Sequence, residues 1–232
     1  GWGDHWYYNG TDDYGWNALP GGMFVKHPYR SFDGLGRDGF WWSSSQYDSG
    51  DAWIRYLFSN YDYVVKNYYS KSYGLSVRCL NDDASSTIPG EDSLYLVKGD
   101  SVLFVYATTD IDSITFYRPN STPSITDADG NVYISVTIGA QEWMSENLRT
   151  SKYSDGTTIP NVTDYDQWGS LTTGAWSYYD NDSQYEAAYG KLYNWYAVET
   201  GKLCPTGWHV PTDEEWTMLT DYLNTAYLNT SG

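Results

Sequence analysis

The side chains best suited to catalysis or metal binding are few in this sequence and lie far apart. The chain has two cysteines, Cys79 and Cys204, and three histidines, His5, His27 and His209. A metal site needs several such side chains at short spacings, and these residues do not have them. The segment "GWNALPGG" (15–22) lacks the serine of a nucleophile elbow. We therefore expect a protein that is not an enzyme and that uses no cofactor. His209, just before a helix, is expected to be a hydrogen-bonded structural residue.

Calcium is the one cation that the residue types could hold. In "YDND" (179–182), Asp180 and Asp182 supply the oxygen ligands that calcium prefers. The same residues precede a predicted helix, where Asp and Asn commonly cap the first turn. We favour capping, with a structural calcium ion as the alternative. "DADGN" (127–131) resembles the start of a calcium loop, but Ile138 stands where that loop needs glutamate, so a hairpin turn is expected.

Residues 41–74 have the composition of a binding surface, rich in Tyr, Ser, Asn, Asp and Gly. Tyrosine gives a large contact area at a small entropic cost, and the small polar residues adapt their hydrogen bonds. Such a surface could recognise a glycan or a host protein, and aromatic content alone does not separate the two. The alternative is that the rings pack the core, to which we assign Trp16, Trp41, Trp42 and Trp53. The candidate ligand contacts are Trp53, Arg55, Tyr61, Tyr63, Tyr68, Tyr69 and Tyr73.

The overall charge excludes two classes of partner. Thirty acidic residues against 13 basic ones give a formal net charge of −17. A field of that sign repels phosphate backbones and anionic lipids, so we expect neither nucleic-acid binding nor membrane insertion. No apolar run is long enough to span a bilayer. The composition is typical of an exported protein. In an oxidising compartment the two cysteines could form a disulfide that closes a long loop; buried thiols are the alternative.

Hydrophobic periodicity and turn residues predict an α+β protein with much irregular structure. Strands are expected at 52–58, 62–68 and 74–80, and again at 132–138, where Val132, Ile134, Val136 and Ile138 alternate. A polar linker (81–90) precedes an insert (91–125) with a hairpin and a third strand, "DSITFYRP". One helix is expected from Ser183 to Gly201. A second is expected from Thr212, with Glu215 completing a capping box.

Several long motifs resemble the Fibrobacter succinogenes major paralogous domain. "DADGNVYISVTIGAQEWMSENLRTSKYSDGTTIP", "YGKLYNWYAV" and "GKLCPTGWHVPTDEEWTMLTDYL" are similar to its first half. "GWNALPGGM", "GFWWSSSQYDSGDAWIRYLF" and "YGLSVRCL" are similar to its second half. The resemblance implies a C-type-lectin-like fold related to formylglycine-generating enzymes. The halves stand in permuted order, with the second at 1–80 and the first at 126–232.

The permuted order leaves two ways to complete the domain. One chain could close on itself, or each unit could complete its neighbour, giving a head-to-tail filament or tandem array of copies. The resemblance further implies a Cys79–Cys204 disulfide, an extracellular cell-surface protein and a Bacteroidota-like source. It also implies O-glycosylation in "DSL", "DSV" and "DSI", at Ser93, Ser101 and Ser113. We expect a structural or adhesive filament protein first, and a monomeric ligand-binding adhesin as the alternative.

Overall fold

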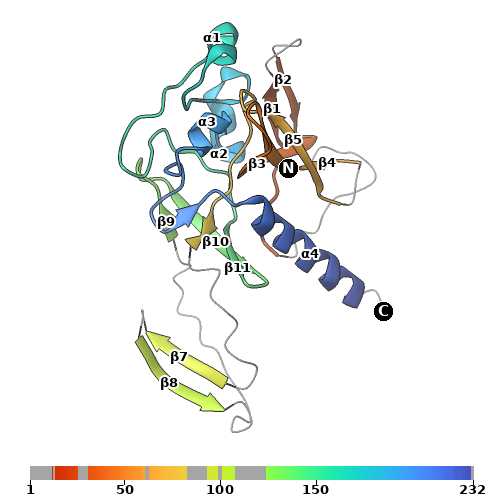
Figure 1. Ribbon diagram of the computed structural model, residues 1–232, viewed down its shortest axis with the longest axis vertical. Coiled ribbons are helices and arrows are strands. Elements are labelled where there is room, and N and C mark those ends of the chain that lie inside the picture. Colours follow the sequence, from red (N-terminus) through yellow and green to blue (C-terminus); the bar gives the residue numbers. More distant parts are fainter. Residues whose placement is uncertain are drawn as a thin grey trace.

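The expected α+β class is confirmed, with strands predominating and short helices between them (Figure 1). A computed structural model describes residues 12, 14–25, 31–60, 63–82, 93–98, 101–107 and 124–230. Side chains are described outside 93–98, 101–107 and 225–230. Most strands belong to two five-stranded sheets.

The first sheet is built entirely from the N-terminal part of the chain, in the order β2-β1-β3-β4-β5. Only the β1–β3 pair is parallel among its pairs. The predicted strand at 52–58 is confirmed, and the one at 62–68 begins and ends a little later. One face of the sheet supplies core side chains such as Phe40, Trp42 and Ile54. The strands are β1 (Gly21–Val25), β2 (Ser31–Leu35), β3 (Asp38–Gln46), β4 (Asp51–Phe58) and β5 (Val65–Ser70).

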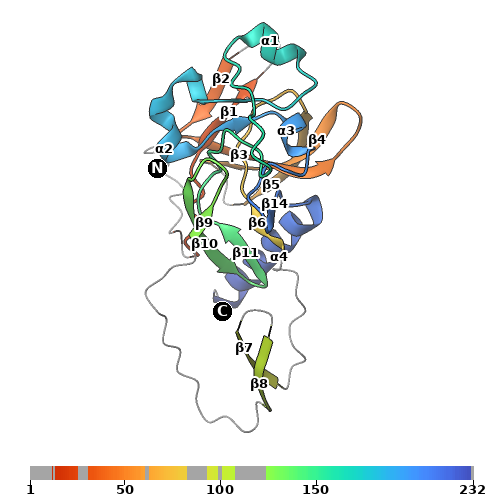
Figure 2. The ribbon, with the colours of Figure 1, turned by 90° about the vertical axis from the view of Figure 1, so that its left-hand side faces the viewer.

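The second sheet interleaves segments from both ends of the sequence, in the order β14-β6-β11-β10-β9. Strand β6 comes from the N-terminal part, yet it pairs on one side with β11 and on the other with β14 (Figure 2). A sheet so ordered cannot form from either half alone. Its strands are β6 (Leu80–Asn81), β9 (Ser124–Thr126), β10 (Val132–Ile138), β11 (Gln141–Met144) and β14 (Trp208–His209).

The strand expected at 74–80 is an extended segment with few ladder contacts. Isolated bridges join Gly74 to Phe24, Ser76 to Trp41 and Leu75 to Tyr193, and only the end of the segment enters β6. The segment from Gly74 to Leu80 is buried throughout. The segment crosses the core between the two parts of the chain, so its apolar residues Leu75 and Val77 and its polar residues Ser76 and Arg78 are all buried.

Strand β10 and the turn before it form as expected. The face that carries Val132, Ile134, Val136 and Ile138 is buried only in part. Val132 is 51% exposed and Ile134 is 44% exposed, whereas Tyr133 between them is fully buried. The Tyr133 hydroxyl donates to Asp127 over 2.6 Å, and its ring lies under the Arg149 guanidinium. These contacts favour burial of Tyr133 on the side that faces the core.

The single helix expected from Ser183 to Gly201 is wrong. The chain instead forms η4 (Ser183–Tyr185), α2 (Glu186–Tyr189), strand β13 (Leu192–Tyr193) and α3 (Trp195–Val198). Gly190 breaks the helix with φ 73° and ψ −155°, a conformation open only to glycine. β13 then pairs with β12 (Trp176–Ser177). Two earlier helical turns are α1 (Tyr165–Ser170) and η3 (Tyr179–Asn181).

The last helix is confirmed as α4 (Asp213–Thr230), and it begins with the expected capping box. Thr212 N–H donates to the Glu215 carboxylate over 2.8 Å, and Glu215 N–H donates to the Thr212 hydroxyl over 3.2 Å. Trp216 and Leu219 pack from this helix into a core cluster that also contains Trp41 and Trp143. The core assignments of Trp41 and Trp42 are confirmed, whereas Trp16 is partly buried and packs against the edge of this cluster.

The insert contains the expected hairpin, formed by β7 (Ser93–Lys98) and β8 (Ser101–Ala107). Among the strands described, these two pair only with each other, and both views draw them apart from the two large sheets. The third strand expected at "DSITFYRP" lies outside the described residues.

Candidate functional site

The two parts of the chain meet at a buried polar centre around Asn147. Its side-chain oxygen accepts from Trp41 Nε1 over 2.9 Å and from Arg78 Nε over 2.8 Å. Its amide nitrogen donates to the Ser76 hydroxyl and to the Tyr189 carbonyl. All of these bonding positions are used, which is the condition for a buried amide to stabilise a core.

Arg78 extends this centre to the segment before β1. Its guanidinium donates to the carbonyl oxygens of Trp16 and Asn17 and lies over the Trp16 ring at 4.3 Å. Burial lowers the pKa of Arg78 to about 9, against the charges of Glu146 and Asp12. The group therefore remains a cation at neutral pH.

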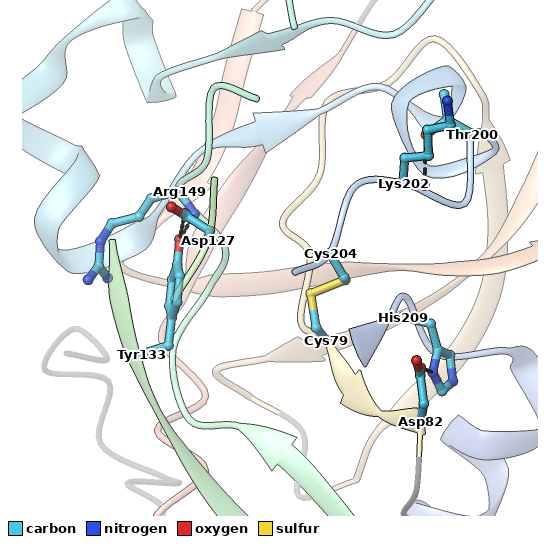
Figure 3. Close-up of a disulfide and its surroundings, with 9 residues drawn as sticks. All are labelled: Cys79, Asp82, Asp127, Tyr133, Arg149, Thr200, Lys202, Cys204 and His209. Carbon is cyan, nitrogen blue, oxygen red and sulfur yellow. Dashed lines mark hydrogen bonds and ion pairs between the residues drawn. A yellow bond between two sulfur atoms is a disulfide. The ribbon is translucent and has the colours of Figure 1, made fainter. Parts of the chain in front are cut away.

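Cys79 and Cys204 form a disulfide within the chain, as expected, with Cα atoms 6.0 Å apart (Figure 3). Cys79 directly follows Arg78, and Cys204 lies just before β14. In this structure the bond joins residues that lie on either side of the insert in one chain. A disulfide is typical of proteins outside the cytoplasm. Within the described part of the chain, no helix is both long and apolar enough to cross a membrane.

Part of the expected ligand surface forms a cluster of three rings, Tyr47, Trp53 and Tyr68, here called the aromatic patch. Tyr47 and Tyr68 stack with centroids 3.9 Å apart, and Trp53 meets the Tyr47 ring edge-on at 4.9 Å. Tyr47 is 45% exposed and Tyr68 is 41% exposed. Trp53 and Tyr68 are opposite one another on β4 and β5, so paired strands hold their side chains on one face. Trp53 is half-buried in this patch rather than in the core.

Tyr47 was absent from the expected contacts although it lies within residues 41–74. The turn that follows it explains its position. Asp48 accepts from the backbone N–H groups of Gly50 and Asp51, and this tight turn brings the end of β3 back against β4. "QYDSGD" is a turn signal that could have identified Tyr47 as a neighbour of Trp53.

Arg55 is a structural residue and not the exposed ligand anchor that was expected. Its side chain is 3% exposed and donates to Asp213 Oδ1 over 2.7 Å. Lys66 reaches the other oxygen of Asp213 over 2.6 Å and lies over the Trp53 ring at 4.2 Å. Burial would raise the pKa of Asp213, but the hydrogen bonds from Lys66 and Arg55 outweigh it, and the pKa is lowered. The first turn of α4 thereby fixes the strands under the aromatic patch.

The remaining candidate tyrosines differ in their exposure to solvent. Tyr63 is 55% exposed. Tyr69 and Tyr73 lie against the core with ring centroids 5.4 Å apart, and burial raises the pKa of Tyr69 to about 12. Both rings are partly buried and pack against the core cluster, and their expected role as ligand contacts stays a prediction. Tyr61 lies outside the described residues.

A polar groove of about 410 Å³ lies where the segment before β1 meets α2. Asn17 and Leu19 form one wall, and Glu146 and Arg149 form another. Each nearby cation is held by a carboxylate: Arg149 by Glu146 at 2.6 Å, and Lys191 by Glu186 at 2.5 Å. The groove could admit a small polar molecule at the junction of the two parts of the chain.

The calcium candidates have different surroundings. Asp182 caps η4, accepting from Gln184 N–H over 2.9 Å, which confirms the capping interpretation for this residue. Asp180 has φ 53°, a left-handed conformation in η3. No group of three or more His, Cys, Asp or Glu side chains suited to a metal occurs among the residues with a described placement. Of the glycosylation candidates, Ser93 begins β7 and Ser101 begins β8, while Ser113 lies outside the described residues.

Comparison with known proteins adds one finding. The family model of the Fibrobacter succinogenes major domain matches residues 136–231. The matched range begins within β10 and includes α4 and the cysteine of "CPTGW". Neither a curated protein nor a solved structure matches the chain.

Proposed function

We propose, since residues 136–231 match the family model of the Fibrobacter succinogenes major domain, that this chain is a non-enzymatic adhesive protein of the cell exterior. In this proposal it binds a glycan or a host protein through the aromatic patch. The observation that carries the proposal is the patch itself, in which paired strands hold the exposed ring of Tyr68 beside the half-buried Trp53, and the exposed ring of Tyr47 stacks on Tyr68.

The surroundings of the patch support binding more than catalysis. Its rings are positioned before any ligand arrives, because Lys66 and Arg55 tie their strands to the first turn of α4. Pre-positioned aromatic side chains lose little entropy on binding and supply a large contact area. The net charge of −17 disfavours anionic polymers, so a neutral glycan or a basic protein surface fits best.

The same proposal includes a C-type-lectin-like domain whose halves occur in permuted order. Its support is the way in which motifs from both ends of the sequence meet. "SVRC" supplies Arg78 and Cys79, "SENLR" supplies Asn147, and "CPTGW" supplies Cys204. In this arrangement the chain needs no neighbour to complete the domain. An experimental structure of the oxidised chain would test the assignment.

The binding proposal is tested with the aromatic patch removed one ring at a time. The oxidised chain is applied to an array of neutral and acidic oligosaccharides and to immobilised mucin. We expect Tyr68→Ala and Trp53→Ala to abolish binding to whichever probes retain the wild type. Tyr222→Ala is the matched control, because Tyr222 is a tyrosine on α4 that is 44% exposed. Retention that survives the patch variants, or no retention of the wild type by any probe, would contradict the proposal.

A second candidate function, the filament, rests on the β7–β8 hairpin. An isolated two-stranded sheet is marginal in water, and among the strands described it pairs with no other. Addition to a sheet edge of another copy would stabilise it. Sedimentation of the full chain tests this candidate. Val105→Pro removes a backbone donor from β8 and should abolish assembly, whereas Val105→Thr should not.

A further inference from the structure

The ring of His209 lies between two carboxylates that come from distant parts of the sequence. Nδ1 is 2.7 Å from Asp82 Oδ1. Figure 3 shows these two side chains facing each other near the disulfide. Nε2 is 2.9 Å from one oxygen of Glu215 and 3.0 Å from the other. Asp82 directly follows β6, and Glu215 is the capping-box residue of α4. The three residues thus connect the end of β6, strand β14 and the last helix.

This geometry can be satisfied only by one protonation state. A neutral imidazole carries a single N–H, while a carboxylate only accepts hydrogen bonds. With both ring nitrogens within hydrogen-bond distance of carboxylate oxygens, only the imidazolium donates to both. In the neutral form, one nitrogen lone pair would face a carboxylate oxygen.

The two contacts differ in how easily they would be lost. The Asp82 side chain is 52% exposed, against 20% for Glu215. Glu215 also accepts from Thr212 N–H, so the capping box holds it in place whatever the state of the ring. A neutral ring would therefore keep its proton on Nε2 and lose Asp82.

We propose that His209 is a proton-operated clasp, which binds Asp82 and Glu215 together in acid and releases Asp82 when the ring loses its proton. The point of release is the end of β6, from which the chain continues into the insert. Acid would tighten the attachment of this end to the body, and alkali would loosen it.

The other charged groups near the clasp do not replace either partner. From β11, Glu142 faces the same strand end, but its carboxylate accepts from Asn81 over 2.7 Å and from Ser135. From α4, Asp213 is held by Arg55 and Lys66.

The hydrogen bond to Glu215, and then that to Asp82, raise the pKa of His209 against the opposing effect of burial. A raised pKa means that the stabilisation is complete below the unfolded value of 6.5 and is lost as pH rises through the folded value.

The proposal is tested by nuclear magnetic resonance on the oxidised, ¹⁵N-labelled chain. The His209 ring is assigned by comparison with His209→Gln. We expect both ring nitrogens to be protonated below a midpoint that lies above 6.5, and Nε2 alone to be protonated above it. Exchange protection of the Asp82 amide, which donates to the Gly207 carbonyl over 3.0 Å, should fall through the same midpoint. Exchange protection of the Met144 amide, which donates to the Cys79 carbonyl on the same segment, should stay constant through this midpoint.

A matched pair of variants separates the clasp from general electrostatics. Asp82→Asn should lower the midpoint of the His209 titration. It should also make the exchange protection of the backbone amide at position 82 independent of pH. Asp155→Asn removes a surface ion pair away from His209, the one with Lys202 at 2.9 Å. It should change neither the His209 midpoint nor the pH dependence of the Asp82 amide. A His209 midpoint at or below 6.5, or an equal effect of both variants, would overturn the proposal.

Discussion

At the scale of single residues, Asn147 shows how a polar side chain can hold two parts of a chain together. It lies in the core and makes four hydrogen bonds, to Trp41, Ser76, Arg78 and Tyr189. Its value lies in satisfying donors that would otherwise be buried without a partner, chiefly the indole of Trp41 and the guanidinium of Arg78.

Replacing Asn147 with alanine should lower the free energy of unfolding by about 2–4 kcal/mol, since two buried donors lose their acceptor. Asn161 is the control, because it is exposed and its side chain donates a bond of 3.2 Å to the Trp176 carbonyl. Asn161→Ala should cost about 0.5 kcal/mol or less. Guanidinium unfolding of the two variants measures the difference. Equal decreases in the free energy of unfolding would show that Asn147 contributes no more to stability than an exposed asparagine.

Asp213 should make the protein less stable in acid. Its pKa is lowered, so its contribution is present above the unfolded value of 3.8 and is lost as pH falls through the folded value. Asp213→Asn should reduce the melting temperature at pH 6 and flatten its decline in acid, because the wild type alone loses this ion pair on protonation. Melting curves between pH 6 and pH 2 test this, with the neighbouring exposed Glu214→Gln as the control. An unchanged acid slope in Asp213→Asn would contradict it.

At the scale of elements, the sequence signals that worked were local ones. The Thr212–Glu215 capping box and the Asp127–Asn131 turn each depend on neighbours within a few residues. The failures have the opposite cause. Tyr189, Leu192, Tyr193 and Tyr196 have helical spacing, which favoured one helix from Ser183 to Gly201. Leu192 and Tyr193 instead pair with β12 and are buried in the core. Periodicity registers burial and does not say which partner buries a residue.

Gly190 ends helix α2 and allows the chain to turn into β13, so a substitution at this position should destabilise the protein. An added Cβ would lie 2.6 Å from the Leu148 carbonyl oxygen, in addition to the strained φ. We expect Gly190→Ala to lower the free energy of unfolding by more than about 2 kcal/mol. Gly156→Ala is the control, because that glycine also has positive φ, 85°, but nothing lies within 4 Å. It should cost only about 1 kcal/mol. Similar costs in thermal or denaturant unfolding would mean that backbone strain alone matters at Gly190.

At the scale of the whole molecule, sequence reasoning anticipated which segments belong together but could not choose between one chain and two. Cys79 and Cys204 were paired through a family resemblance, and no spacing rule could establish that bond. Likewise, Arg55 looked like a surface anchor because Asp213, its partner, is 158 residues away. Contacts over such distances are visible only after folding.

Closure within one chain predicts that the oxidised protein runs as a monomer on a non-reducing gel. Reduction should lower the free energy of unfolding by about 5 kcal/mol, the chain-entropy value for so long a loop. The double variant Cys79→Ser, Cys204→Ser should be insensitive to reductant in guanidinium unfolding. A ladder of oligomers that reductant collapses would instead place the bond between copies and favour the filament.

The disulfide has one more consequence, which concerns cleavage of the chain. Cys79 and Cys204 are separated by 125 residues, and the insert lies between them. A peptide bond broken anywhere in that interval would leave the two pieces joined through sulfur. Strand β6 would also still lie between β11 and β14. A protease that cuts the insert would thus change the connectivity of the polypeptide without separating its two pieces, and separation would require both a reductant for the disulfide and a denaturant for the shared core.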